Sequence, residues 1–381
     1  MTKIVIAALA CLLLAAFSLR TSAAQSVSST TASSQSAATK PITAAELVSK
    51  YKATCDSVHS FTTKCRRTMT RDSKLTGRSG AYSGVTRRES IEEMRYDGGK
   101  RVSCRRWRWG NVLVLPTTIV PEESRQYTSH LCTGARIISN SYAVDTAPRR
   151  RDRVNISDAY GSEVQRKSLL ASFGDAELRG YMESDQQPLA DILPQATSLT
   201  LRTGREVVGG VWCFVLDATT PNGKYTVWID PQHGYNLARV HMNKLPGDLV
   251  HGRPLPPGRR IGMTLNVTRF AKIGEIWAPM EADVTHVTRQ IDGGATDSKG
   301  HIVRTEVVLN PDWTGTKAFD PDDIREGAMV TFTPHFPNIH CIWQGGKVLL
   351  DPREGDLQAA DPRLQKLIAE FNGQAASQPA K

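Results

Sequence analysis

The residues with the clearest chemical potential form a basic tract at 101–109, Arg-Val-Ser-Cys-Arg-Arg-Trp-Arg-Trp. Guanidinium groups bind phosphates and carboxylates, and indole rings can stack on nucleic-acid bases. If the tract is a β-strand, Trp107 and Trp109 share one face while Arg106 and Arg108 share the other. The indoles then pack inward, and the guanidiniums face water, an anionic membrane surface or an anionic envelope protein. Arg105, Arg106 and Arg108 are therefore candidate contacts for such a partner.

Motifs of the commonest enzyme classes are absent from the sequence. It contains no Gly-x-Ser-x-Gly, no glycine-rich phosphate loop, no dinucleotide-binding fingerprint and no His-Glu-x-x-His. Among the nine histidines, His233, His241 and His251 form the one group of three that lie near one another, and they fall on an expected turn, strand and loop. The acidic pairs are adjacent residues, which point to opposite faces of a strand. The sequence thus predicts a protein that is not an enzyme and has no cofactor and no metal site.

The N-terminus has the pattern of a secretory signal peptide. Lys3 precedes an apolar run from Ile4 to Phe17, and the small residues Ser22-Ala23-Ala24 follow it. We expect cleavage near Ala24 and a periplasmic or secreted protein. An exported protein rarely meets nucleic acid, so we expect no nucleic-acid partner for the basic tract.

The positive charge of the chain is a local feature. The formal net charge of the 381 residues is +10 at pH 7. Residues 64–153 contain 20 Lys and Arg against 9 Asp and Glu, so this segment carries more positive charge than the whole chain. We therefore expect the charge to lie on one face of one sheet, within the first strands.

Six cysteines remain after cleavage of the leader. An even number of cysteines in an exported protein makes disulfides plausible, and buried thiols are the alternative. No Cys-x-x-Cys is present, which argues against a metal site. The sequence does not define how the cysteines pair. They are Cys55, Cys65, Cys104, Cys132, Cys213 and Cys341.

The elements that must position these residues begin with one amphipathic helix. Thr43 and Glu46 have the spacing of a capping box, and apolar residues recur at helical intervals up to about Val58. Asp97-Gly98-Gly99-Lys100 is a hairpin signal, and most of the remaining chain has the pattern of strands. Strands are expected over 61–70, 84–96, 101–109, 126–131, 135–142, 198–202, 211–218, 224–230, 237–243, 260–270, 276–288 and 303–310. Helical segments are expected over 162–173, 176–182, 189–193 and 362–371.

This order of elements resembles the LolA-like family of periplasmic lipoprotein carriers, which includes the receptor LolB and the sensor domain of RseB. The best local match runs from Tyr225 to Val240, where a Val-Trp-Ile-Asp strand meets a glycine-containing turn and then Arg239 on the next strand. Gly274-Glu275-Ile276-Trp277-Ala278-Pro279 is similar to another strand start of the family. The resemblance implies an α+β fold, a curved antiparallel half-barrel that is covered by helices.

The resemblance also divides the chain into parts. It covers residues 43–310 as the half-barrel domain. A signal peptide (1–24) and a disordered Ser/Thr-rich tether (25–42) precede this domain. A small C-terminal extension (311–372) and a disordered tail (373–381) follow it.

In that family, the space between the half-barrel and its helices takes acyl chains. The resemblance therefore implies an exported envelope protein that binds a lipid or lipoprotein acyl chain, with lipoprotein sorting as one role. Ordinary core packing is the competing explanation for each apolar residue. The alternative function is a non-catalytic interaction or envelope-sensor module of the same fold, which contacts an anionic partner through its basic strands. The candidate cavity wall is Trp107, Trp109, Trp212, Phe214, Val227, Ile229, Met263 and Leu265. The candidate lid is Leu169, Leu170, Phe173, Leu189, Ile192 and Leu193, of which the first three are the candidate ligand contacts.

Overall fold

The computed structural model describes residues 41–77, 80–109, 126–134, 136–144, 152–158, 162–183, 185–352 and 361–376. The predicted signal peptide (1–24), residues 25–40 of the predicted tether and residues 377–381 of the predicted tail lie outside these ranges. All elements described below belong to the unit that begins at Ile42. None of the helices in the described ranges is long and apolar enough to cross a lipid bilayer.

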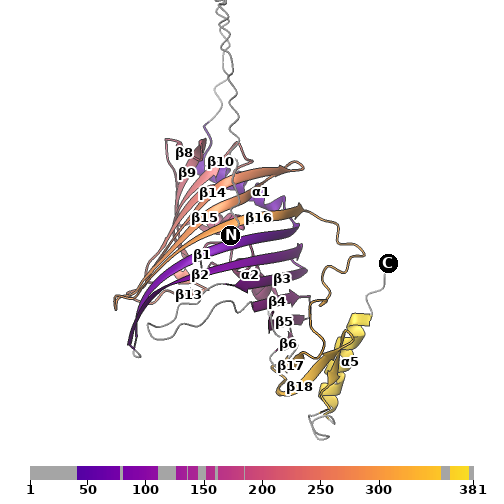
Figure 1. The fold of residues 1–381 in the computed structure, drawn as a ribbon. Helices are drawn as coiled ribbons and strands as arrows, with labels where there is room; N and C mark the ends of the chain where they lie inside the picture. The colour runs from indigo at the N-terminus through magenta and orange to yellow at the C-terminus, as the bar shows by residue number, and fades with distance from the viewer. Residues whose placement is uncertain are drawn as a thin grey trace, which may run out of the picture. The chain divides into compact units, whose positions relative to one another are not determined.

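A large, mostly antiparallel sheet dominates this unit, and within the described residues it does not close on itself (Figure 1). The described neighbours are antiparallel except for β6 and β17, which are parallel. At one edge of the sheet, β7 (Ser198–Leu201) and β8 (Glu206–Val208) both pair with β9 (Val211–Thr220), and β10 (Gly223–Asp230), β11 (Asn236–Lys244), β14 (Arg260–Ile273), β15 (Ile276–Arg289) and β16 (Ala295–Leu309) follow in this order. The middle of the sheet continues from β16 with β1 (Ser60–Gly77), β2 (Gly80–Asp97), β3 (Arg101–Trp109), β4 (Gln126–Cys132), β5 (Arg136–Ala143) and β6 (Arg153–Asp158). The other edge consists of β17 (Met329–Thr333), β18 (Phe336–Gln344) and β19 (Lys347–Leu350). Strands β12 (Leu249–Val250) and β13 (Arg253–Pro254) form a separate hairpin.

Long strands and bulges shape the sheet. β1 and β2 are each 18 residues long. The register between β1 and β16 shifts at Lys64/Cys65, and the pairings of β10 with β11 and of β14 with β15 contain further shifts. A bulge adds one residue to one strand of a pair, which bends the strand and increases its twist. The sheet is accordingly curved in Figure 1.

Helix α1 (Ala44–Asp56) begins as the sequence predicts. The Thr43 hydroxyl accepts a hydrogen bond from the Glu46 N–H at 3.2 Å, and the Glu46 carboxylate accepts one from the Thr43 N–H at 2.8 Å. Leu47, Val48 and Tyr51 are buried in a cluster with side chains of β10, β11 and β14. We call the face of the sheet that α1 covers the inner face. Burial of each large apolar side chain there stabilises the fold by roughly 1.5–3 kcal/mol.

Short helical elements after β6 cover the neighbouring part of the inner face. They are α2 (Ser162–Ser172), η1 (Ala176–Arg179), α3 (Leu189–Ile192) and η2 (Leu193–Gln195). We call residues 162–183 and 185–195 the lid. The predicted helical interruption is confirmed, but the segment 176–182 forms only one 3-10 turn, which ends at Gly180 with φ 85°. Glycine is needed at this position, because a Cβ there would lie 2.7 Å from the Tyr51 hydroxyl.

Residues beyond 310 continue the same sheet. β17 pairs with β6, β18 and β19 follow, and helix α5 (Pro362–Ala376) lies beside them (Figure 1). The predicted C-terminal helix is confirmed, and β18 and β19 are joined by a tight turn in which Gln344 is opposite Lys347. Val154 and Ile156 of β6 share one buried cluster with Val330, Phe332 and Leu364. The segment that the sequence separates as an extension therefore shares a core with β4–β6.

Candidate binding cavity

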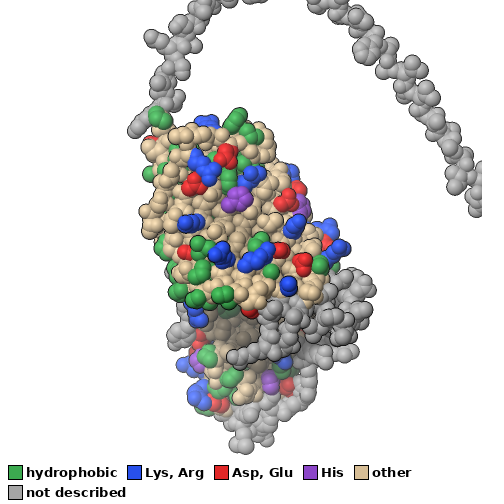
Figure 2. Space-filling view, turned by 90° about the vertical axis from the view of Figure 1, so that its left-hand side faces the viewer, with side chains coloured by type: hydrophobic (Ala, Val, Ile, Leu, Met, Phe, Trp, Pro, Cys, Tyr) green, Lys and Arg blue, Asp and Glu red, His purple; other side chains and the backbone are tan. Residues whose placement is uncertain are grey.

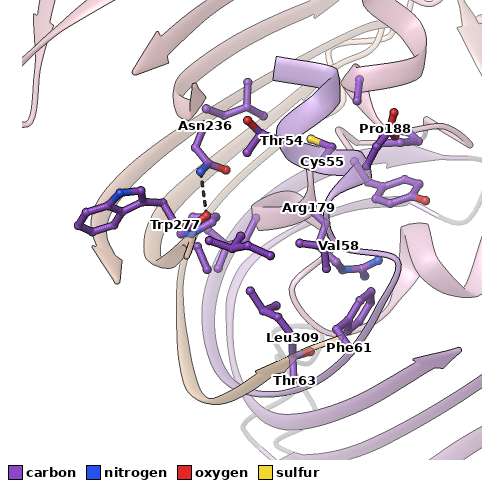
Figure 3. A pocket seen from close by; sticks show the side chains of 18 of the residues that line it. Thr54, Cys55, Val58, Phe61, Thr63, Arg179, Pro188, Asn236, Trp277 and Leu309 are labelled. Carbon is purple, nitrogen blue, oxygen red and sulfur yellow. Dashed lines mark hydrogen bonds between the residues drawn. The ribbon is translucent and has the colours of Figure 1, made fainter. Parts of the chain in front are cut away.

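A cavity of about 420 Å³ lies between the end of α1, the lid and the inner face of the sheet (Figure 3). Because side chains from all three walls are mostly apolar or aromatic, we call it the apolar cavity. Thr54 and Cys55 lie at its α1 end, Phe61 of β1 and Leu309 of β16 lie beside each other at the opposite end, and Trp277 of β15 stands at its side (Figure 3). Further lining residues are Tyr51, Tyr96, Leu170, Leu178, Tyr181, Leu237, Leu265, Val267 and Ile276.

Most polar groups around the apolar cavity are already engaged. The Thr54 hydroxyl donates to the Gly234 carbonyl, and the Asn236 amide donates to the Trp277 carbonyl at 2.9 Å. The hydroxyls of Tyr51 and Thr63 differ, because both are buried without a nitrogen or oxygen partner among the described residues, and the Tyr51 hydroxyl contacts only the Cys55 thiol. The Tyr51 side chain is the larger of the two. Burial raises its pKa well above the usual value, so it stays a neutral hydroxyl. It is a polar group that a ligand could use.

A layer of buried ion pairs fastens the lid to the sheet beside the apolar cavity. Arg304 Nε of β16 donates to Asp175 at 2.5 Å, and Arg179 Nε donates to the same carboxylate at 2.9 Å. Burial raises the pKa of Asp175, but the charges of Arg304 and Arg179 outweigh it and hold the pKa at about 2. Arg67 of β1 binds Glu177 through two hydrogen bonds of 2.6 and 3.1 Å. These contacts join η1 to two central strands.

A second set of anchors holds the segment that leads to α3. Lys244 Nζ donates to Asp185 at 2.5 Å, and both side chains are fully buried. The Tyr225 hydroxyl and the Asn222 amide donate to the same carboxylate at 2.8 and 3.1 Å. Removing either charge of such a pair leaves the other one buried and unpaired. The lid is thus fixed on both sides of residue 184.

Only two of the predicted wall and lid residues line the apolar cavity. They are Leu170 of α2 and Leu265 of β14. Val227, Ile229 and Met263 lie on the inner face as predicted, but they are packed with α1 in the core, with Phe214 partly buried beside them. Phe173 and Leu169 pack in a second cluster, against β2–β5. These residues are therefore part of the packed core, as the competing explanation expected, and they do not contact the apolar cavity.

The predictions for the tryptophans require correction. Trp212 is 56% exposed on β9, opposite Val207 of the short strand β8, and does not line the apolar cavity. Trp107 and Trp109 lie on the face opposite to Arg106, as alternation predicts, but it is Arg106 that lies under the lid. Its guanidinium binds Glu92 at 2.9 Å and the Ser172 carbonyl at 2.8 Å, which offsets the cost of burying it.

The basic tract does not present a row of free guanidiniums. Arg105 forms an ion pair with Asp322, and Arg106 pairs with Glu92. Arg108 has no such partner among the described residues. On the face that Figure 2 shows, lysine and arginine side chains are interspersed with aspartate and glutamate. Two of the three arginines that were predicted to contact a partner, Arg105 and Arg106, are therefore paired with carboxylates of the same chain.

The cysteines are free thiols, and the structure forms no disulfide among the six that were predicted to remain. Five of them are buried, and burial raises the pKa of Cys55 and Cys104 to about 12. Buried thiols, the alternative to disulfides, are what the structure contains. In the described part of the chain no group of His, Cys, Asp and Glu is arranged to hold a metal ion. His233 instead binds Asp230 at 2.5 Å and stacks on Phe270.

Comparisons with known proteins identify no family for this chain. No protein-family model matches the sequence, and no curated protein matches it significantly. A structure of lipid–protein interactions in lipovitellin matches with 10% identity and a TM-score of 0.31, covering 66% of this chain and 26% of that one. This chain thus spans about a quarter of the lipovitellin chain.

Two structures of MucB bound to MucA also match. The Pseudomonas aeruginosa MucA/MucB complex matches with 10% identity and a TM-score of 0.21, covering 71% of this chain and 99% of that one. MucB with MucA(peri) matches with 11% identity and a TM-score of 0.19, covering 71% and 100%. Similarities this low assign neither a family nor a function, so the LolA-like assignment stays a proposal.

Several residues of the apolar cavity were missed by sequence reasoning. Val58, Tyr181 and Leu309 lie at the ends of elements, where periodicity carries little information. In the sequence, Trp277 belongs to a predicted strand start that resembles one of the family, and nothing there marks it as a cavity residue. Its position beside Asn236 could not be inferred, because β11 and β15 are not neighbours in the sheet.

Proposed function

We propose that this chain is an exported, non-catalytic envelope protein of LolA-like fold whose apolar cavity binds one acyl chain of a lipid or lipoprotein. The observation that carries the proposal is the cavity itself. Its volume of about 420 Å³ lies within the ~300–1,000 Å³ range of ligand pockets. Protein interiors are otherwise close-packed, so an apolar space of this size between a helix and a sheet favours a ligand.

The walls and the Tyr51 hydroxyl suit an amphiphile. Leu178, Leu265 and Val267 offer methyl groups to a hydrocarbon chain, and Tyr96 and Trp277 offer ring faces. The Tyr51 hydroxyl is placed to donate to an ester or carboxyl oxygen of the ligand. Such a ligand would gain apolar burial along its chain and one hydrogen bond.

The ligand enters without release of the lid anchors. Swinging the lid away would separate Asp175 from Arg304 and Asp185 from Lys244. Breaking a buried pair in this way costs roughly 3–5 kcal/mol. The smaller movement is at the end of α1, where Lys52 and Asp191 form an exposed contact of 2.8 Å.

A matched pair of tryptophan substitutions tests the proposal. Leu309 lines the apolar cavity, whereas its neighbour Val308 is 51% exposed on the other face of β16. Leu309→Trp fills the space and should weaken binding of a fluorescent fatty acid at least tenfold. Val308→Trp should change the affinity less than twofold. Native mass spectrometry of protein purified from its own envelope should detect a bound lipid, and a consistently empty cavity would overturn the proposal.

Export and location are part of the same proposal. The predicted leader, residues 1–24, supports them. Cell fractionation should recover the mature chain outside the cytoplasm, with an N-terminus near Gln25. A variant without the leader should stay in the cytoplasm.

The sensor alternative keeps less support. Its anionic partner was expected to contact Arg105, Arg106 and Arg108, and the first two are paired within the chain. Charge reversal of Arg105 and Arg106 should therefore lower stability. If the charge-reversal variant no longer recovered a partner from the envelope but kept its stability, the sensor function would be favoured over acyl-chain binding.

A further inference from the structure

A second cavity, of about 290 Å³, lies on the inner face of β1, β2 and β3. We call it the basic cavity, because five arginines line it: Arg67, Arg71, Arg88, Arg106 and Arg108. Its other side is closed by the end of α2, by the segment around Met182, and by His251. Tyr181 lines both this cavity and the apolar one.

The strand register explains why the arginines gather. Arg88 of β2 is opposite Met69, and Arg71 is opposite Thr86, so Arg71 and Arg88 are diagonal neighbours. Arg108 of β3 is opposite Ser90, which makes it the diagonal neighbour of Arg88. Diagonal neighbours on one face are about 7–8 Å apart at the backbone, within reach of long side chains. Three arginines that line one cavity therefore lie along a diagonal across three adjacent strands.

The charges of two lining arginines are neutralised within the protein. Arg67 forms its two hydrogen bonds with Glu177, and Arg106 binds Glu92. The other acidic residues of the wall are also engaged. Glu89 pairs with Arg66 and accepts from the Trp109 indole, and Glu183 lies 3.0 Å from His286.

The remaining three arginines have no carboxylate partner among the described residues. Arg71 donates only to the Ser298 hydroxyl, at 3.3 Å. Arg88 and Arg108 form no hydrogen bond or ion pair in the described part of the chain. Burial, then the charges of Arg106 and Arg88, lower the pKa of Arg108. Like charges on neighbouring strands oppose folding. The charges of Glu92 and Glu183 act on Arg108 and Arg71, but among the described residues neither carboxylate forms an ion pair with them.

We propose that Arg71, Arg88 and Arg108 bind one phosphate-type oxyanion in the basic cavity. A guanidinium presents its donors in a planar fork that matches the oxygens of phosphate. Three such forks on one diagonal can surround a single group of two negative charges. The site is separate from the apolar cavity and does not depend on an acyl ligand. The phosphate can be free or can be the headgroup of a lipid that lies across Tyr181.

Titration of the mature chain with inorganic phosphate, followed by calorimetry at low ionic strength, tests the site. The wild-type protein should bind phosphate saturably. Arg88→Gln and Arg108→Gln should each weaken binding at least tenfold. Arg87→Gln is the matched control, because Arg87 is the next residue of β2, points to the other face and is exposed. It should change the affinity less than twofold.

Dioctanoyl phosphatidic acid, used below its micelle concentration, distinguishes the two sources of phosphate. Tighter binding than inorganic phosphate, lost in Arg108→Gln, assigns the site to a lipid headgroup. Equal affinities assign it to free phosphate. The proposal is overturned if neither compound binds, or if Arg87→Gln weakens binding as much as Arg88→Gln and Arg108→Gln. The two site variants should keep or raise the unfolding midpoint, because each removes one of several like charges.

Discussion

The inner face of strand β1 passes from the apolar cavity to the basic cavity along its length. Phe61 and Thr63 line the first, whereas Arg67, Met69 and Arg71 line the second. All five are alternate residues of one strand and point to the same face. The buried pairs of Arg304 with Asp175 and of Arg67 with Glu177 lie between the two regions. Whether a cavity on this sheet is apolar or basic therefore depends on the position along the strand and on the lid residues that cover that position. The face of the sheet alone does not decide it.

The largest expected effect comes from breaking the charge layer between the two cavities. Asp175→Ala leaves Arg304 and Arg179 buried without their carboxylate and should lower the free energy of unfolding by about 3–5 kcal/mol. Urea unfolding measures it. Asp297→Ala is the control, because its pair with Arg289 is exposed and should contribute about 0–1 kcal/mol. Similar losses in the two variants would show that the layer does not hold the lid.

A cavity-creating pair compares the walls of the two regions directly. Leu265→Ala removes a fully buried side chain beside the apolar cavity and should lower the free energy of unfolding by about 2–5 kcal/mol. Met69→Ala, in the partly buried wall of the basic cavity, should have a smaller effect. The same urea experiment measures both. Equal losses would contradict the distinction between a packed apolar wall and a wet basic one.

Acid should weaken the charge layer in a defined range of pH. The pKa of Asp175 is held at about 2 in the folded protein and is about 3.9 in an unfolded chain. Its contribution, roughly 2–3 kcal/mol, is therefore present above about pH 4 and is lost as the pH falls towards 2. The difference in unfolding free energy between wild type and Asp175→Asn should shrink over this range. A difference that is constant from pH 6 to pH 3 would exclude this linkage.

The smallest effect is expected at the exposed contact near the end of α1. Lys52 and Asp191 are 39% and 44% exposed and 2.8 Å apart. Lys52→Met should lower the free energy of unfolding by only about 0.2–1 kcal/mol, and the effect should fade in 1 M salt because the pair is screened. Fatty-acid binding kinetics should change more than stability, if α1 is the element that moves. Unchanged kinetics would place the entry elsewhere.

Much of the fold was predictable from local sequence. The capping box at Thr43 and Glu46, the turn at Gly98 and Gly99 and the alternation along Ile261 and Met263 rest on neighbours within a few residues. The site was less predictable. Of the wall and lid candidates, Leu170 and Leu265 reach the apolar cavity, because alternation indicates which residues share a face but not where on that face a gap is left.

The sequence by itself determined the order of elements, the helical interruption after the first strands and the concentration of positive charge in residues 64–153. Only the tertiary structure decided which face of β3 lies under the lid. Arg106 is partly buried there, and Glu92, on the neighbouring strand, and the lid carbonyl of Ser172 receive its hydrogen bonds. Asp175 meets Arg304 across 129 positions of sequence. Such pairings depend on strand register over the whole sheet, and no short-range pattern specifies that register.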